Sequence, residues 1–251
     1  MIIRYFSDLH LEFIDDISFF ISKIKKGNNE EVCVCAGDIG NPYEPHYDIF
    51  MQFLSNNFTQ SFIITGNHEY YNKKKSISEI NYFLQTYFSK FNNITFLNNN
   101  FVYYNNYCFI GTTLWTNVSD FSEKINDAYS IKDYIENIEK YNENYRKSVE
   151  FLQNSLENNK NCVVITHHLP SYLLVDNKFK KPNMEGVNQW FYSNLDNLIN
   201  DYKSKIKCWI YGHTHIPSHY LISDIPFICN PIGYPCENKY HDFTCTFKTP
   251  T

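Results

Sequence analysis

Short apolar runs recur along the chain, and each predicts a β-strand. They are four or five residues long and almost uninterrupted by polar positions, and they lie at residues 2–6, 32–36, 62–65, 162–166 and 208–211. Continuous apolar character is typical of strands buried on both faces, because a half-exposed strand alternates apolar with polar positions. The pattern therefore predicts sheets that are covered on both sides.

Segments with helical spacing of apolar residues separate these runs. They lie at residues 16–26, 48–56, 75–88, 119–158 and 186–202. The fourth segment is long and charged, and its apolar positions recur at helical intervals, from Ile131 and Ile135 to Ile138 and Tyr141. This periodicity predicts one or two helices there.

Further strand-like segments lie outside this alternation. Residues 94–97, 102–104 and 107–111 are separated by Asn-rich turns, which predicts antiparallel hairpins. The tail has strand character at residues 220–222, 227–229 and 243–247. With neither an internal repeat nor a linker rich in Pro, Gly and Ser, the pattern predicts a single α/β domain with mixed sheets over residues 1–251. We expect residues 119–158 to be a helical insertion near the cleft of that domain.

The composition excludes several classes of protein. Of the 251 residues, 43% are hydrophobic and 20% are charged, which is ordinary for a globular domain. The net charge of −5 provides no general basic field for nucleic acid. The apolar runs are too short to cross a membrane, and the N-terminus lacks the pattern of a secretory leader, so we expect a cytoplasmic protein. None of the eight cysteines forms a CxxC pair, and we expect reduced thiols in the core.

Side chains that can bind a metal follow each of the five apolar runs. In chain order they are Asp8 and His10, then Asp38, then Asn67 and His68, then His167 and His168, then His213 and His215. In open α/β sheets, ligands bind beyond the carboxyl ends of the strands. If the five strands are neighbours, these side chains meet in one place.

The chemistry of this set favours a metal site. Asp8 and Asp38 would carry uncompensated charge among imidazoles unless cations bind between them. A single Asp at a strand end is usually a helix cap and a single His a core or surface group, but repetition at five strand ends argues against that interpretation. Imidazole, carboxylate and amide ligands suit Mn, Fe or Zn better than Ca or Mg. Because more ligands are present than the four that one Zn needs, we expect two divalent metal ions, Mn²⁺ first, with Fe or Zn as alternatives.

The motifs around these residues resemble those of the calcineurin-like metallophosphoesterase superfamily. Its blocks are D-x-H, G-D, G-N-H-[DE], H and G-H-x-H, and they correspond here to residues 8–10, 37–38, 66–69, 167 and 212–215. The segments S-D-L-H-L-E at 7–12 and G-N-H-E-Y-Y at 66–71 are similar to the compact bacterial and viral members. The resemblance implies a four-layer α-β-β-α sandwich, in which two mixed β-sheets are flanked by helices.

The resemblance also implies a role for each residue. One metal would be held by Asp8, His10, Asp38 and His215, and the other by Asp38, Asn67, His167 and His213. Asp38 would bridge the two ions, and His68 would contact the phosphate and protonate the leaving group, so catalysis is assigned to Asp38 and His68. Two such cations would lower the pKa of a bridging water, so that hydroxide attacks phosphorus near neutral pH.

Departures from related subfamilies narrow the expected activity. The Ser/Thr protein phosphatases of the superfamily carry G-D-x-x-D-R-G, whose second Asp orients the catalytic His and whose Arg grips phosphate. Asn41 and Pro42 stand at those positions here. Asn41 can hydrogen-bond His68, but it cannot stabilise an imidazolium as a carboxylate would. We therefore expect a phosphodiesterase on a nucleotide or another small substrate, with a phosphomonoesterase or a protein phosphatase as alternatives. A noncatalytic binding scaffold of the same fold is disfavoured, because the metal ligands and His68 are all present.

Several residues are candidates for contact with the substrate. They are Asn67, His68, Asn41, Trp115 and His168. Trp115 follows a predicted strand and could stack on a base at the cleft rim or belong to the core. Asn126 and Asp127 either line the cleft or cap a helix. The expected partner is a phosphate ester, with nucleotides among the candidates and without a membrane or a general nucleic-acid partner. The sequence does not predict the oligomeric state.

Overall fold

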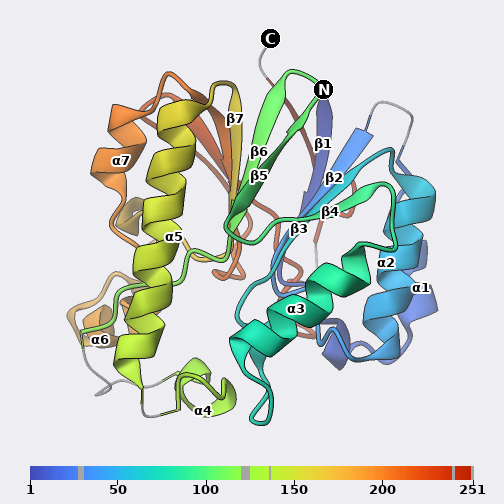
Figure 1. Cartoon of the computed structure of the whole chain (residues 1–251), viewed down its shortest axis with the longest axis horizontal. Helices are drawn as coiled ribbons and strands as arrows, with labels where there is room; N and C mark the ends of the chain where they lie inside the picture. Colours follow the sequence, from blue (N-terminus) through green and yellow to red (C-terminus); the bar gives the residue numbers. More distant parts are fainter. Residues whose placement is uncertain (28–30, 120–124, 136, 239–240, 250–251) are drawn as a thin grey trace.

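The computed structural model describes residues 1–27, 31–119, 125–135, 137–238 and 241–249. Two mixed β-sheets pack face to face, and helices cover the outer face of each sheet (Figure 1). This is the four-layer α-β-β-α sandwich that the resemblance implies. No helix in the described part of the chain is both long and apolar enough to span a membrane.

The first sheet contains, within the described residues, strands in the order β11-β1-β2-β3-β4. Their bounds are β1 (Ile2–Phe6), β2 (Glu31–Ala36), β3 (Ser61–Ile64), β4 (Ile94–Phe96) and β11 (Thr246–Lys248). Strands β1 to β4 run parallel, and β11 pairs antiparallel with β1. The carboxyl ends of β1, β2 and β3 therefore lie at the same end of this sheet.

The second sheet, as far as the structure describes it, has the order β5-β6-β7-β8-β10-β9. Its strands are β5 (Asn100–Tyr104), β6 (Tyr107–Thr112), β7 (Cys162–Thr166), β8 (Ile206–Ile210), β9 (Ser218–Ile222) and β10 (Ile225–Cys229). Strands β6, β7, β8 and β10 are parallel, and antiparallel partners β5 and β9 close the two edges.

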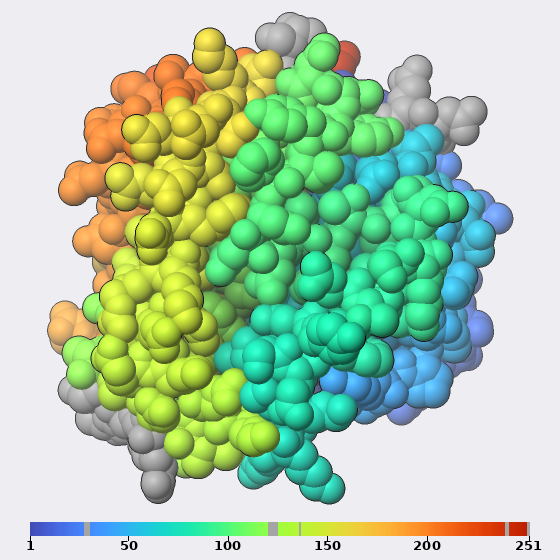
Figure 2. Space-filling view, in the orientation of Figure 1, coloured from blue at the N-terminus to red at the C-terminus, as the bar shows by residue number. Residues whose placement is uncertain are grey.

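Helices cover the outer faces of both sheets. Helices α1 (Ile17–Ser22), α2 (Pro45–Asn57) and α3 (Ile77–Phe88) lie over the first sheet, and α5 (Ile138–Asn158) and α7 (Asp196–Asp201) lie over the second (Figure 1). Shorter elements are α4 (Asp127–Ser130), α6 (Glu185–Asn188) and the 3₁₀ turns η1 (Leu11–Phe13), η2 (His68–Tyr70), η3 (Tyr172–Leu174), η4 (Asn177–Phe179) and η5 (Pro182–Met184). In the space-filling view, side chains fill the surface between α5 and α3 (Figure 2).

Both faces of the central strands are buried, which explains why their sequences are continuously apolar. In β2, Cys33 and Cys35 pack toward the helices, whereas Val34 packs against the second sheet. Across this interface Phe62 of β3 stacks on Phe109 of β6, with 3.8 Å between ring centroids. Burying an aromatic or aliphatic side chain of this size contributes roughly 1.5–3 kcal/mol. The core between the sheets therefore holds the strand ends rigidly in place.

Two local predictions are wrong. Residues 94–97 do not form a hairpin, because β4 joins the first sheet parallel to β3 and only β5 and β6 form the antiparallel pair. Residues 186–202 are not one helix, because an irregular segment separates α6 from α7. The predicted segment 119–158 contains α4 and α5, and its residues 120–124 and 136 lie outside the described part of the chain.

Candidate metal centre

The five loops that carry the predicted ligands come from both sheets. Those after β1, β2 and β3 leave the first sheet, and those after β7 and β8 leave the second. The N–H of Asp8 donates to the carbonyl of Gly37 at 3.0 Å, and the N–H of Gly212 donates to the carbonyl of His167 at 3.0 Å. The five strands are thus divided between the two sheets and are not all neighbours in one sheet. Their carboxyl ends meet because the two sheets pack face to face.

Five predicted ligands have a left-handed backbone conformation. The φ angles are 51° at Asp8, 47° at His10, 51° at Asp38, 68° at His213 and 50° at His215. Such values are uncommon outside glycine, and strained residues cluster at functional sites. Close by, a Cβ at Gly66 would collide with Oδ1 of Asp38, so glycine is required there. The loops thus have an unusual backbone that directs several side chains to one point.

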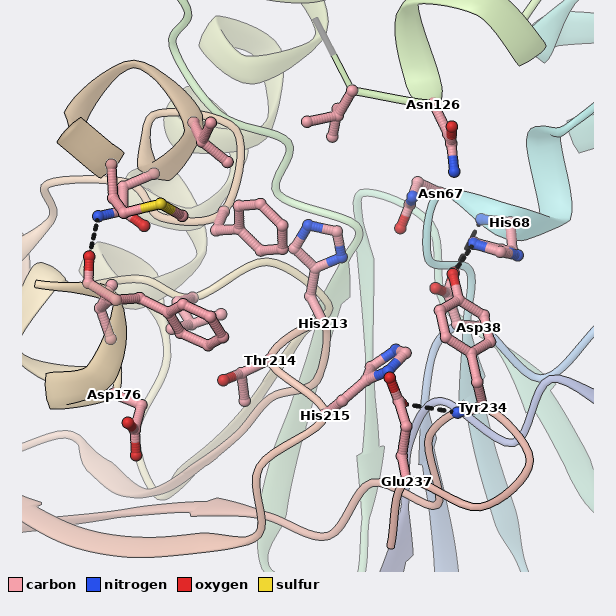
Figure 3. Close-up of a pocket in the computed structure, with 18 of the residues that line it drawn as sticks. Asp38, Asn67, His68, Asn126, Asp176, His213, Thr214, His215, Tyr234 and Glu237 are labelled. Atoms are coloured by element: carbon pink, nitrogen blue, oxygen red, sulfur yellow. Dashed lines mark hydrogen bonds and ion pairs between the residues drawn. The ribbon is translucent and has the colours of Figure 1, made fainter. Parts of the chain in front are cut away.

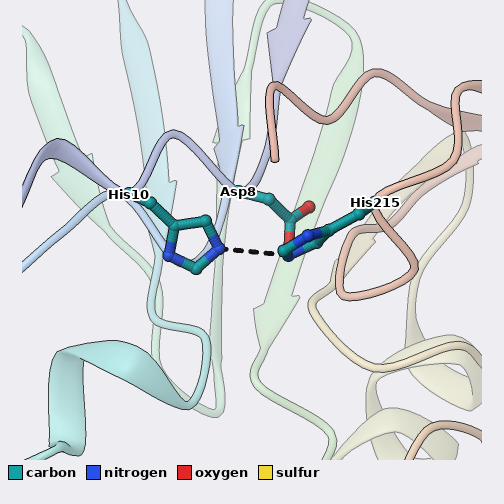
Figure 4. Close-up of side chains that lie close together, drawn as sticks. All are labelled: Asp8, His10 and His215. Atoms are coloured by element: carbon teal, nitrogen blue, oxygen red, sulfur yellow. Dashed lines mark hydrogen bonds and ion pairs between the residues drawn. The ribbon is translucent and has the colours of Figure 1, made fainter. Parts of the chain in front are cut away.

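Three groups of side chains bring potential ligand atoms within 4.8 Å of one another. They are Asp8, His10 and His215; His10, Asp38 and His68; and Asp38, His167 and His213. Figure 4 shows the first group, in which the rings of His10 and His215 approach each other beside Asp8. The amide oxygen of Asn67 lies 3.0 Å from Nε2 of His167. The structure therefore brings the seven predicted metal ligands together, with His10 and Asp38 each shared between two groups.

Hydrogen bonds on the outer nitrogens orient the imidazoles. In His10, Nδ1 lies 3.3 Å from a carboxylate oxygen of Glu12. In His167, Nδ1 lies 2.9 Å from the carbonyl oxygen of Ala36, and in His215, Nδ1 lies 2.6 Å from a carboxylate oxygen of Glu237. A proton on Nδ1 leaves Nε2 with a lone pair for a metal. The Nε2 atoms of His10 and His215 are 3.1 Å apart, and the buried Nε2 of His213 has no hydrogen-bond partner among the described residues. Electron pairs that converge in this way fit divalent cations.

The buried charges in the site are mutually dependent. Burial opposes the ionisation of Asp38, but the neighbouring His167, His68 and His10 hold the pKa of its carboxyl well below the usual range. Conversely, burial disfavours a charged His167, yet Asp38 and Asp8 raise its pKa to about 10. A site that holds a proton this firmly provides the negative potential that divalent cations need, and a bound metal would displace that proton.

Glu12 is the partner of His68, and sequence reasoning missed it. Its carboxylate accepts a hydrogen bond from Nδ1 of His68 at 2.9 Å. Asn41 instead caps a turn, where its side chain accepts from the N–H of Tyr43 and donates to Glu44. The expectation that Asn41 contacts His68 is therefore wrong. The last residue of the S-D-L-H-L-E segment was the available signal, because it follows the first ligand loop directly.

Two more carboxylates support the ligands from behind. Asp127 is fully buried and accepts hydrogen bonds from the amide nitrogen of Asn67 and from the hydroxyl of Tyr71, both at 2.8 Å. The first of these bonds turns the amide oxygen of Asn67 toward His167. Glu69 accepts from the backbone N–H groups of Asp38, Ile39 and Gly66 at 3.1, 2.8 and 2.8 Å. It therefore joins the second ligand loop to the third.

Trp115 and His168 do not line the site. Trp115 is 5% exposed and packs edge-on against Tyr134 and Tyr141, with centroids 5.0 and 5.5 Å away. His168 is fully buried behind His213, and its ring centroid lies 4.3 Å from that of His213. Burial lowers the pKa of His168 to about 3, so this imidazole is neutral. The structure places both residues in the packing beneath the site, whereas Asn126 lines the cavity.

A cavity of about 280 Å³ opens beside these ligands. Asp38, Asn67 and His68 line it on one side, as Figure 3 shows, and residues of the segment 169–191 line the other. The hydroxyl of Tyr234 lies 3.1 Å from Nε2 of His68, at the border of this space. The cavity is therefore bordered both by predicted metal ligands and by an imidazole.

Comparisons with known proteins agree with the fold and with the motifs that carry the predicted ligands. The family model of calcineurin-like phosphoesterases matches residues 1–217. An uncharacterized protein of Acanthamoeba polyphaga mimivirus is 34% identical over 266 residues, covering 95% of this chain and 93% of the relative. The fold is similar to that of phosphopantetheinyl hydrolase from Mycobacterium tuberculosis, with a TM-score of 0.71 and 14% identity over 94% of this chain and 91% of that one. A putative 5′-nucleotidase from Staphylococcus aureus has a TM-score of 0.52 and 14% identity, and the match covers 93% of this chain and 49% of that one.

Proposed function

The chain belongs to the calcineurin-like phosphoesterase family, and from this premise we propose that it is a two-metal hydrolase of a small phosphate ester. The observation that carries the proposal is the convergence of seven oxygen and nitrogen ligands in one place, in groups that share His10 and Asp38. We assign one ion to Asp8, His10, Asp38 and His215, and the other to Asp38, Asn67, His167 and His213. We propose Mn²⁺ as the metal, with Fe or Zn as alternatives.

The metal ligands and His68 divide the chemistry between them. Two divalent cations held by these ligands would supply a water acidic enough to attack phosphorus near neutral pH. His68 lines the cavity, and Glu12 accepts from its Nδ1, so Nε2, which lies beside the Tyr234 hydroxyl, is the atom that would face a substrate. We assign to Nε2 the transfer of a proton to the departing alkoxide.

The electrostatics of His68 support this role. Burial disfavours its charged form, but the carboxylates of Asp38 and Glu12 raise the pKa of His68 above its ordinary value. A larger fraction of the imidazole is then protonated near neutral pH than in free histidine. Glu12 therefore supplies the carboxylate that stabilises the imidazolium, which Asn41 cannot. His68 can then act as the general acid although the Asp of the protein-phosphatase motif is replaced by Asn41.

We propose that the substrate is a phosphodiester, with a nucleotide or another small molecule as its organic part. The cavity of about 280 Å³ is close to the smallest volumes typical of small-molecule sites, and Asn126 and Tyr71 border it beside His68. The phosphomonoesterase alternative stays open. We further propose that residues 1–251 act as one domain in which the segment 119–158 brings Asn126 and Asp127 to the site.

Metal reconstitution tests the proposal. Protein stripped with chelator and reloaded with Mn²⁺ should bind two ions and hydrolyse bis(p-nitrophenyl) phosphate faster than p-nitrophenyl phosphate. Asp38→Asn should abolish activity, because it removes the charge shared by both metal groups. Asp48→Asn is the matched control, since Asp48 lies on α2 and bonds only Tyr87 among the described contacts of its side chain. If the reloaded protein neither retains metal nor cleaves either ester, the proposal of an enzyme is refuted, and a noncatalytic binding scaffold of the same fold is favoured.

A further inference from the structure

One wall of the cavity is apolar. It is formed by six side chains from the connection between β7 and β8, which we call the apolar wall: Leu169, Val175, Phe179, Met184, Val187 and Phe191. The wall begins at the metal ligands, because the ring of Phe191 lies 4.6 Å from that of His213. An apolar surface that starts at a polar site and continues away from it can hold the organic part of a substrate.

The apolar wall is built into the fold. The N–H of Leu169 donates to the carbonyl of Phe191 at 3.1 Å, and the N–H of Ser193 donates back to Leu169 at 2.7 Å. Within the segment, the side chain of Asn188 donates to the carbonyl of Phe179 at 2.9 Å. These bonds close the base of the connection and join its two arms. The wall is thus formed before a ligand binds, which lowers the entropic cost of binding.

The wall lies across the site from His68. Figure 3 shows Asp176 and Thr214 on one side of His213 and His215, and His68 and Asn126 on the other. Asp176 belongs to the same connection as the wall. A group that rests on the wall therefore extends away from the imidazole that serves the leaving group.

The charges around the wall select against a second anionic group. Asp176 and Glu237 line the cavity, and its described lining residues include neither Lys nor Arg. Neither of the two lysines that flank Phe179 is among these lining residues: Nζ of Lys178 lies over the Phe179 ring, 4.8 Å from its centroid, and Nζ of Lys180 donates to the carbonyl of Leu173 at 3.3 Å. An additional phosphate at the wall would approach these two carboxylates, and no Lys or Arg among the described lining residues would pair with it.

We propose that the apolar wall is the binding subsite for an uncharged apolar arm of the substrate, either an aromatic ring or a short aliphatic chain. This inference rests on the proposed function, because it places the phosphate at the metal ligands. The substrate class is then a phosphate ester with a single phosphate and a hydrophobic arm. Esters that carry a second phosphate and polynucleotide chains bind poorly there.

The test compares two non-hydrolysable ligands, phenylphosphonate and methylphosphonate, by calorimetry on the Mn²⁺-loaded protein. Phenylphosphonate should bind at least about tenfold more tightly, a difference of about 1.4 kcal/mol. Phe179→Ala should reduce this preference several-fold, and Val187→Ser provides a second variant on the same wall. Because Phe179 is 36% exposed, its removal leaves the core intact. Phe101→Ala on the edge strand β5, where the side chain is 44% exposed, is the matched control and should preserve the preference.

The outcomes separate this inference from the proposed function. Equal affinities for the two phosphonates, no measurable binding of phenylphosphonate, or a preference unchanged in both wall variants overturns the subsite. Hydrolysis of bis(p-nitrophenyl) phosphate is measured on the same preparations. If hydrolysis is absent while the phenyl preference and its loss in Phe179→Ala are found, the subsite stands and the proposed reaction falls. If hydrolysis is present and the preference is absent, the reverse holds.

Discussion

Replacing Glu12 by Gln tests the proposed general acid directly. The substitution preserves the shape of the side chain and removes its charge. In the metal-free protein, burial opposes the charge of Glu12, but His10 and His68 lower its pKa to about 2, from an ordinary value of 4.5. Because one pKa unit corresponds to about 1.4 kcal/mol, the ionised carboxylate is stabilised by roughly 3 kcal/mol in this environment. Part of this interaction is the stabilisation of the His68 imidazolium by the Glu12 carboxylate, and the Gln substitution removes that part.

The effect on turnover depends on the leaving group. A p-nitrophenolate departs with little help, whereas an alkoxide must be protonated as the bond to phosphorus breaks. We therefore expect Glu12→Gln to lower kcat on an alkyl diester roughly 10–100-fold, the range typical when a partner behind an active-site group is lost. The p-nitrophenyl diester should lose much less. Metal content is measured in parallel at saturating Mn²⁺, because Glu12 also contacts the ligand His10.

The pH profile provides the second measurement. His68 must be protonated to donate, so activity falls as the pH rises through its pKa. Glu12 contributes to raising that pKa, and the Gln variant should therefore lose activity at a lower pH than the wild type. An equal loss of kcat on both esters, with the alkaline limb unmoved and the metal retained, would show that Glu12 does not act through His68.

Two further substitutions test the carboxylates behind the ligands. Asp127→Ala should lower Mn²⁺ affinity roughly 10–100-fold, because the amide of Asn67 loses its acceptor. Asp127→Asn, which keeps one acceptor oxygen, should change it far less, and similar titration curves for the two variants would contradict this role. Glu69→Ala should lower the free energy of unfolding by at least about 3 kcal/mol in urea, since three buried N–H groups lose their acceptor. For comparison, Glu79→Ala removes an exposed capping residue of α3 and should lower the free energy of unfolding by only about 1 kcal/mol.

The buried strands and the candidate ligands could be read from the sequence because both follow patterns that are local in the chain, whereas the four-layer arrangement was implied by the family resemblance. Strands buried on both faces must be apolar throughout, and each ligand follows such a strand within a few residues. The error at β4 has a physical cause. Whether a short strand pairs with the one before it or the one after it depends on how α3 packs, and the strand itself does not encode this choice.

Hydrogen bonds between side chains of different loops were harder to predict from the sequence. Glu12 reaches His68 across 56 positions of the sequence, and Asp127 reaches Asn67 across 60. Trp115 was ambiguous for the same reason, since only the packing of Tyr134 and Tyr141 around it shows that it belongs to the core. Contacts of this kind depend on the assembled fold, and residue types alone do not reveal them.

The position of Glu12 also bears on the choice between diester and monoester. In the protein phosphatases of the superfamily, an Arg next to the acid that orients the catalytic His balances the charge of the phosphate. Here the acid comes from the first loop, and the described residues that line the cavity include no Arg. A monoester dianion would face Asp176 and Glu237 with compensation from the metal ions and His68 but from no Lys or Arg among the described lining residues. A diester carries one charge fewer and a second organic arm that the apolar wall can bury, so both features of the cavity support the diester.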